Sequence, residues 1–178
     1  IFASGAIASA TSVILYEGEQ TIVELARTLE EKKPDISQVK GIGYKENKKI
    51  ITAKIRPILQ NLDELPFPAR DTLERVVEKG GLPALSFSRG CYARCSFCSI
   101  TQFYKEAGRN LRYRSVDNCI KEISRIKKKF PKIRDFWIVD DEFGLGRDFN
   151  TRIPELCGKL SQFNLRLRIY CRADEITP

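Results

Sequence analysis

The chain carries the stretch Ser88-Arg89-Gly90-Cys91-Tyr92-Ala93-Arg94-Cys95-Ser96-Phe97-Cys98, which directly follows a predicted strand. Its spacing puts the thiols of Cys91, Cys95 and Cys98 on one short loop, where they can converge on a single inorganic centre. Four protein ligands close a structural zinc site or an ordinary iron-sulfur cluster, and this loop supplies one fewer. The fourth position would be open to a non-protein ligand, and we expect the chemistry of the chain to take place there.

A structural zinc site is the main alternative interpretation of this loop. The chain contains no histidine, so a fourth protein ligand would have to be Cys119, Cys157 or Cys171. The first two lie on apolar stripes of predicted helices, and the third lies on the apolar side of a predicted strand. We therefore expect all three to be small core residues. A disulfide framework is disfavoured, because the spacings suit a reduced intracellular protein and no secretory signal is visible.

Strands and helices alternate regularly in the second half of the chain. The hydrophobic patterns predict strands at 82–88, 133–139 and 165–172, and helices at 116–129 and 152–161. This βαβαβ order is typical of a parallel sheet with right-handed crossovers. Ligands of such sheets bind beyond the carboxyl ends of the strands. The cysteine loop, the acids at 140–142 and Arg172 are all expected at that edge.

Residues 1–56 are predicted to form the end of a separate α/β unit. The patterns indicate a strand end at 1–3, a strand at 12–16, an amphipathic helix at 22–29 and a hairpin at 39–52 that turns near Glu46. The stretch that follows contains Pro66 and Pro68, which favour a stiff and irregular connection. We predict domain boundaries at 1–56, 57–80 and 81–178.

The cysteine loop resembles that of the radical S-adenosylmethionine (SAM) enzymes, including the aromatic Phe97 before the third cysteine. The resemblance continues through Gly108-Arg109, 112–115 and 140–143. It implies that Cys91, Cys95 and Cys98 hold a 4Fe-4S cluster whose fourth iron is chelated by the amine and carboxylate of SAM. Reduction of the cluster would cleave SAM to methionine and a 5'-deoxyadenosyl radical, which abstracts hydrogen from an unactivated carbon.

The same resemblance implies a set of SAM-contacting residues: Phe97, Asp140, Asp141, Glu142 and Arg172. The acids would meet the methionyl ammonium, and Arg172 would meet either the SAM carboxylate or Asp140 or Asp141. The alternative is an acid cluster paired with Arg89 or Arg147. Arg109, Arg112 and Arg114 are candidates for reaching the substrate or the cobalamin periphery, whereas Ser115 is expected to cap a helix.

A second resemblance lies in Glu17-Gly18-Glu19-Gln20-Thr21, which is similar to the Gly-Glu-x-Thr signature of the cobalamin-binding domain that precedes many radical SAM barrels. Ser4-Gly5-Ala6 resembles a degenerate form of the Gly-Gly turn of that domain. These similarities imply cobalamin contacts at Gly5, Glu17, Gly18 and Glu19. The alternative for 17–21 is an ordinary strand-to-helix turn.

The two resemblances together imply an α/β fold. The tail of a Rossmann-like cobalamin-binding domain would be followed by the first half of a partial (β/α) radical SAM barrel, since a full barrel takes about 250 residues. The chain contains no methionine and begins with Ile1, and we expect it to be an excerpt of a longer protein.

Charge is unevenly distributed along the chain. Residues 1–85 hold 12 basic and 12 acidic side chains, whereas residues 86–178 hold 19 and 11, which accounts for the net charge of +8. The lysines at 127–129 are expected at a solvated helix end rather than at a nucleic-acid site. A basic half would attract a small anionic substrate. With no apolar run long enough for a membrane span, we expect a cytoplasmic protein.

The sequence therefore predicts a radical SAM enzyme that performs cobalamin-dependent methyl transfer or rearrangement at an unactivated carbon and takes electrons from a flavodoxin or ferredoxin. Two alternatives stay open. One is a cobalamin-independent tRNA-modifying enzyme of the methylthiotransferase type. The other is a non-enzymatic zinc or iron-sulfur module.

Overall fold

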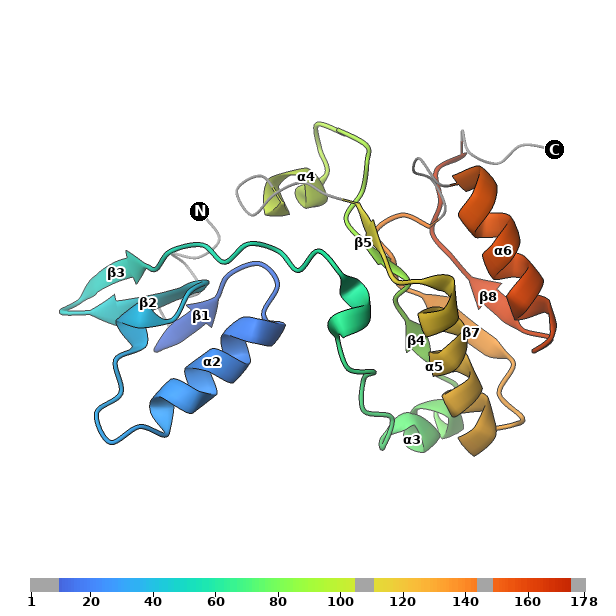
Figure 1. Cartoon of the computed structure of the whole chain (residues 1–178), viewed down its shortest axis with the longest axis horizontal. Coiled ribbons are helices and arrows are strands. Elements are labelled where there is room, and N and C mark those ends of the chain that lie inside the picture. The colour runs from blue at the N-terminus through green and yellow to red at the C-terminus, as the bar shows by residue number, and fades with distance from the viewer. Residues whose placement is uncertain (1–9, 105–110, 144–148, 174–178) are drawn as a thin grey trace. The chain divides into compact units, whose positions relative to one another are not determined.

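The computed structural model describes residues 10–104, 111–143 and 149–173 (Figure 1). By their contacts these residues divide into two units. The first comprises 10–59 with 101–104, and the second comprises 60–100, 111–143 and 149–173. The strand end expected at 1–3, Gly5, Arg109 and Arg147 lie outside the described residues.

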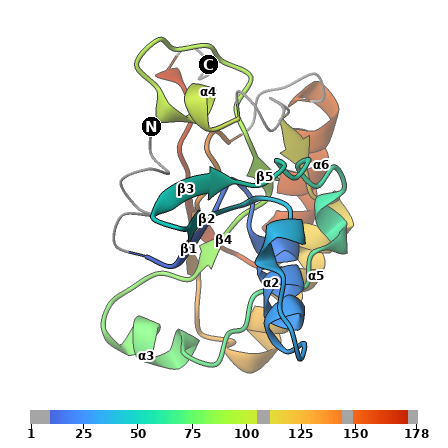
Figure 2. The same ribbon diagram turned by 90° about the vertical axis from the view of Figure 1, so that its left-hand side faces the viewer.

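The first unit contains a three-stranded antiparallel sheet in the order β1 (Ser12–Ile14), β2 (Ile42–Glu46) and β3 (Lys49–Thr52). Helix α2 (Glu19–Leu29) lies beside this sheet (Figure 2) and buries Leu25 against Val39, Ile42 and Tyr44. The predicted hairpin is confirmed. It turns at Asn47 and Lys48, whose positive φ angles of 46° and 64° are typical of tight hairpin turns.

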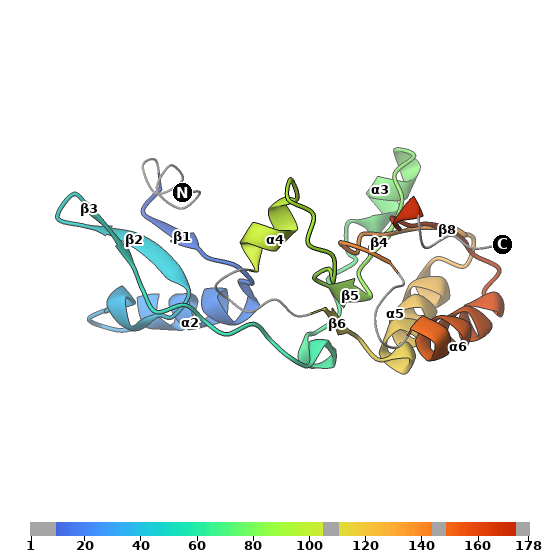
Figure 3. The same cartoon turned by 90° about the horizontal axis from the view of Figure 1, so that it is seen from above.

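The second unit contains a parallel sheet in the order β4 (Ala84–Leu85), β7 (Asp135–Ile138) and β8 (Arg166–Arg168), as the βαβαβ pattern predicted. Helices α5 (Val116–Lys129) and α6 (Phe149–Ser161) lie side by side and cover one face of it (Figure 3). Ser115 caps α5 as predicted, because its Oγ accepts a hydrogen bond from the Asn118 amide at 3.1 Å. The remaining short elements are η1 (Ile36–Gln38), η2 (Leu62–Glu64), α3 (Leu73–Glu78), β5 (Ser88–Arg89), α4 (Ser99–Phe103) and β6 (Arg112–Tyr113).

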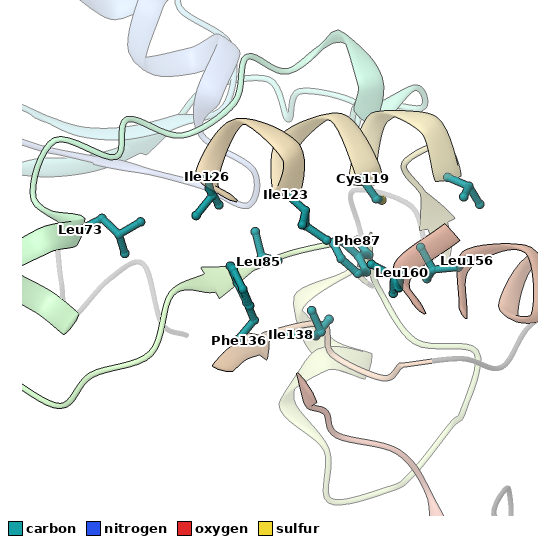
Figure 4. Close-up of a cluster of buried hydrophobic side chains, with 11 residues drawn as sticks. Leu73, Leu85, Phe87, Cys119, Ile123, Ile126, Phe136, Ile138, Leu156 and Leu160 are labelled. Carbon is teal, nitrogen blue, oxygen red and sulfur yellow. The ribbon is translucent and has the colours of Figure 1, made fainter. Parts of the chain in front are cut away.

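The core of the second unit lies between the sheet and the two helices (Figure 4). Phe136 and Ile138 of β7 and Ile123 of α5 are completely buried, and Leu156 of α6 is almost so. Successive residues of an extended chain point to opposite faces, so Val139, directly after β7, stays 42% exposed beside a fully buried Ile138. Within the described residues, none of the helices is both long and apolar enough to span a membrane.

The predicted strand at 82–88 is interrupted in the structure. It forms β4 as far as Leu85, and a second short strand, β5, begins at Ser88 and pairs antiparallel with β6. Between them the amide of Phe87 donates to a side chain, Asp140, rather than to a neighbouring strand. The sequence pattern did not reveal this break, because Leu85 and Phe87 keep the alternation of a continuous strand and both are buried.

Of the three cysteines expected in the core, only Cys119 is buried. Cys157 and Cys171 are exposed, so the prediction was wrong for both. Cys157 sits at the edge of the apolar stripe of α6, whose buried face is formed by Leu156 and Leu160. Strand β8 ends at Arg168, so the alternation that placed Cys171 inside does not extend that far.

Replacing Ile138 with alanine is expected to lower the free energy of unfolding by about 2–5 kcal/mol, because the change opens a cavity in the core. The control is Val139→Ala on the adjacent, exposed position, which should change it by no more than about 0.5 kcal/mol. Urea denaturation of both variants checks this. Equal effects at the two positions would contradict the orientation in which the Ile138 side chain points into the core and the Val139 side chain points away from it.

Cys119 is expected to resist thiol reagents in the native protein. Burial raises the pKa of its thiol to about 11, so only about one molecule in a thousand carries the thiolate at pH 8. A colorimetric thiol reagent at pH 8 should modify the exposed Cys157 but leave Cys119 unmodified until denaturant is added. Mass spectrometry of tryptic peptides distinguishes the two sites, and fast native labelling of Cys119 would contradict its burial.

Candidate active site

The cysteine loop follows β5 and leads into α4, and its three thiols are free and half-buried. The Ala93 amide donates to Cys91 Sγ at 3.4 Å, and the Cys98 amide donates to the Cys95 carbonyl at 3.2 Å. Across the described part of the chain, no group of three or more cysteine, aspartate or glutamate side chains is arranged to hold a metal ion. The thiols therefore share a loop but are not gathered around a common centre.

The donor set of this loop fits an iron-sulfur cluster in its chemistry. Burial raises the pKa of the Cys91 thiol above its usual value, and the nearby charges of Glu142, Cys98 and Asp141 add to the shift. Bound iron would stabilise the thiolate, because a cation favours the deprotonated form of a thiol.

Asp140 lies at the carboxyl end of β7 and is only 4% exposed. Its Oδ1 accepts a hydrogen bond from the Phe87 amide at 2.7 Å, and its Oδ2 accepts one from Ser88 Oγ at 2.8 Å. Burial raises the pKa of this carboxyl, and the hydrogen bonds from Ser88, Phe87 and Ser86 oppose that rise. The structure thus joins Asp140 to the segment that leads into the cysteine loop.

Asp141 and Glu142 are placed differently from each other. Asp141 is exposed, yet its Oδ2 accepts a hydrogen bond from the Gly90 amide at 2.8 Å, directly before Cys91. Glu142 is 4% exposed and acts electrostatically on Cys91. The three predicted acids are therefore brought to the start of the cysteine loop.

Arg172 and Phe97 also lie at this loop. Arg172 Nη1 is 3.8 Å from Cys95 Sγ, so the guanidinium lies beside one of the proposed ligands. Phe97 belongs to the loop itself, and 91% of its surface is exposed. An aromatic ring in that position offers a face against which a ligand can stack.

Sequence reasoning missed a buried ion network behind the loop. Glu122 of α5 is 2% exposed and accepts from Arg70 and from Arg114, each at 2.6 Å. Arg114 also donates to the Ser86 carbonyl at 2.8 Å. A glutamate on the apolar face of a helix was the available signal, since buried carboxylates are normally paired. The suggestion that Arg114 reaches the substrate is therefore corrected: its guanidinium supports the end of β4.

Glu17, Gly18 and Glu19, three of the residues proposed for cobalamin, lie in the first unit at the start of α2, whereas Gly5 is outside the described residues. Glu17 accepts a hydrogen bond from the Tyr104 hydroxyl at 3.3 Å, and Glu19 is exposed in the first turn of the helix. Gly18 is packed closely, because a Cβ atom there would lie 3.0 Å from Ile14 Cγ2. The neighbouring Tyr16 ring meets Phe103 edge-on at 5.6 Å.

Comparison with known proteins gives one family match. The family model described as "Radical SAM superfamily" matches residues 85–178, just over half of the chain. This range includes the cysteine loop, the three acids and Arg172.

Two curated relatives extend the similarity. An uncharacterized methyltransferase of Pyrococcus horikoshii is 34% identical over 151 residues, which are 81% of this chain and 32% of the relative. Hopanoid C-3 methylase of Methylococcus capsulatus is 36% identical over 136 residues, which are 72% of this chain and 23% of that protein. The chain thus spans a third or less of these relatives.

A solved structure has a similar fold. The cobalamin-dependent SAM radical enzyme OxsB, with aqua-cobalamin and SAM bound, aligns with a TM-score of 0.79 and 25% identity. The alignment covers 98% of this chain and 25% of that protein. It therefore includes both units, although the described strands of the first unit are antiparallel.

Replacing Glu122 with glutamine is expected to lower the free energy of unfolding by about 3–5 kcal/mol, because two partly buried guanidinium groups lose their counter-charge. Glu155→Gln is the matched control. It removes an exposed helix pair with Lys159 and should leave the urea midpoint unchanged. An unchanged midpoint in Glu122→Gln would show that the network contributes nothing to stability.

Proposed function

The chain belongs to the Radical SAM superfamily, and we propose that it is part of a cobalamin-dependent enzyme that cleaves SAM and transfers a methyl group to an unactivated carbon. The observation that carries this proposal is the cysteine loop at the carboxyl edge of a parallel sheet, with Asp140 and Asp141 bonded to its first residues. Both curated relatives described above carry methyl-transfer names. Methyl transfer is favoured over rearrangement on that ground.

Cys91, Cys95 and Cys98 are the proposed cluster ligands. A reduced 4Fe-4S cluster held there would supply the electron that cleaves SAM. Three protein ligands leave one iron for SAM, which requires its amine and carboxylate to lie at this edge of the sheet. The lack of a fourth cysteine on the loop is thus a requirement of the chemistry rather than a defect of the site.

The proposed SAM contacts are the residues around this open position. Arg172 supplies a cation for the carboxylate, and its place beside Cys95 would bring that carboxylate to the loop. The acids Asp141 and Glu142 give the region the negative charge that an ammonium group requires. Asp140 is buried beside them and is bonded to the start of the loop, and Phe97 offers an exposed ring for stacking.

Cobalamin is proposed to bind the first unit. The turn at Glu17, Gly18 and Glu19, together with Gly5, is the candidate contact, and 1–56 would be the C-terminal part of a Rossmann-like cobalamin-binding domain. Residues 57–80 would then link it to the first half of a partial barrel at 81–178. The similarity to OxsB, whose structure holds aqua-cobalamin, supports this division because it covers nearly the whole chain.

The partners follow from the chemistry. Cluster reduction needs an electron donor such as flavodoxin or ferredoxin, and the basic second half favours a small anionic substrate. Both requirements suit a cytoplasmic enzyme, in which thiols stay reduced.

Single alanine substitutions of Cys91, Cys95 and Cys98 are expected to abolish cluster assembly, because each removes one of three indispensable ligands. The complete protein is reconstituted anaerobically with iron and sulfide. Iron content, the electron paramagnetic resonance signal of the reduced cluster and 5'-deoxyadenosine formation with SAM are then measured. Cys157→Ala, an exposed cysteine on α6, is the control and should behave as the unmodified protein.

Three results would contradict the proposed function and favour another one. Tight zinc binding without a cluster, or a cluster whose signal SAM does not perturb, would point to a structural or electron-transfer module. A functional cluster combined with no cobalamin uptake in an absorbance titration would point to a cobalamin-independent radical SAM enzyme.

A further inference from the structure

The chain between β4 and the first proposed cluster ligand is irregular. Strand β4 ends at Leu85, and the backbone reaches Cys91 through a segment that is no longer paired with β7. Gly90, directly before Cys91, has a φ of +88°, a conformation that residues with a Cβ rarely adopt. Residues 86–90 therefore set the position and direction in which the cysteine loop starts. The short pairing of β5 with β6 holds Ser88 and Arg89, and side chains hold other groups of this segment.

Side chains that follow β7 and precede α5 bond several groups of this segment. Asp140 accepts from the Phe87 amide and the Ser88 hydroxyl, and Asp141 accepts from the Gly90 amide. From the opposite direction Arg114 donates its guanidinium to the Ser86 carbonyl, and its own amide donates to the Phe87 carbonyl at 2.9 Å.

Asp140 accepts two of the hydrogen bonds that hold this segment. Both of its carboxylate oxygens accept hydrogen bonds from the segment, and the side chain is 4% exposed. Because the side chain is buried, a ligand that arrives from solvent has little access to the remaining acceptor sites of this carboxylate. Asp141 differs because it is exposed, so it can bond Gly90 and still face a ligand.

We propose that Asp140 is a positioning residue for the cluster loop and that it acts through Phe87 and Ser88 rather than as a contact of the SAM ammonium. This inference rests on the proposed function of the cysteine loop as a cluster site. Its physical basis is that an ordered loop start keeps the Cys91 sulfur near the position it needs, so fewer loop conformations release iron.

The test compares Asp140→Ala and Asp140→Asn with the unmodified protein, all reconstituted and without SAM. Loss of the cluster to an iron chelator is followed by absorbance. Asp140→Ala should lose the cluster about tenfold faster, because two buried donors lose their acceptor. Asp140→Asn should be intermediate, since its amide oxygen can still accept from the Phe87 amide but its NH2 group cannot accept from Ser88.

Ile138→Ala is the control for general destabilisation. It weakens the same strand two residues earlier without removing a hydrogen bond to the segment, and circular dichroism confirms that each variant is folded at the assay temperature. The cluster of this variant should be lost at the unmodified rate. Equally fast loss in Ile138→Ala and Asp140→Ala would overturn the proposal.

The affinity for SAM is the second measurement, and it distinguishes a SAM ligand from a positioning residue. If Asp140→Ala keeps its cluster at the unmodified rate but binds SAM more weakly, Asp140 is a SAM ligand and the positioning role is wrong. If the unmodified protein assembles no cluster, the proposed function fails instead. Amide hydrogen exchange of the cluster-free protein then tests the hydrogen bonds alone: exchange of the Phe87 amide should accelerate in Asp140→Ala and stay unchanged in Ile138→Ala.

Discussion

The hydrogen bonds between Asp140 and the segment Phe87–Ser88 are the interaction on which the candidate site depends. Backbone groups that leave a sheet must find new partners, because a buried amide without one costs free energy. Here the partner is a carboxylate at the end of the adjacent strand. Its burial is unfavourable, as the raised pKa shows, and the hydrogen bonds that it accepts offset part of that cost. The result is a defined start for a loop that has no regular structure of its own.

A buried network of ion pairs around Glu122 is the second constraint on this unit. Glu122 forms ion pairs with both Arg70 and Arg114 inside the unit, and Arg114 in turn donates to the Ser86 carbonyl. Phe67 of the same unit contributes, because its ring lies 5.3 Å from the Arg114 guanidinium. Helix α5, the stretch 67–70 and the end of β4 are thus joined by charge, whereas the rest of the unit is held by apolar packing.

Patterns of hydrophobicity predicted which helices and strands form better than they predicted where each one begins and ends. The parallel order of β4, β7 and β8 and both long helices followed from periodicity, because each buries one face in a common core. The strand predicted at 82–88 was too long, since periodicity does not reveal where side chains replace the ladder as partners. Cys157 and Cys171 were placed in the core for a similar reason: a residue at the edge of a stripe, or beyond a strand end, shares the pattern of its neighbours but not their burial.

The sequence by itself determined the three-cysteine loop and its family, the acids that follow β7 and the alternation of strands and helices, because these are properties of spacing along the chain. Only the tertiary structure decided what the acids and arginines bond. Asp140 and Asp141 are about fifty residues from their partners in the chain, and Arg114 turned out to support a strand end rather than a ligand. Such pairings depend on the register of β4 against β7 and on the packing of α5, which local sequence patterns do not encode.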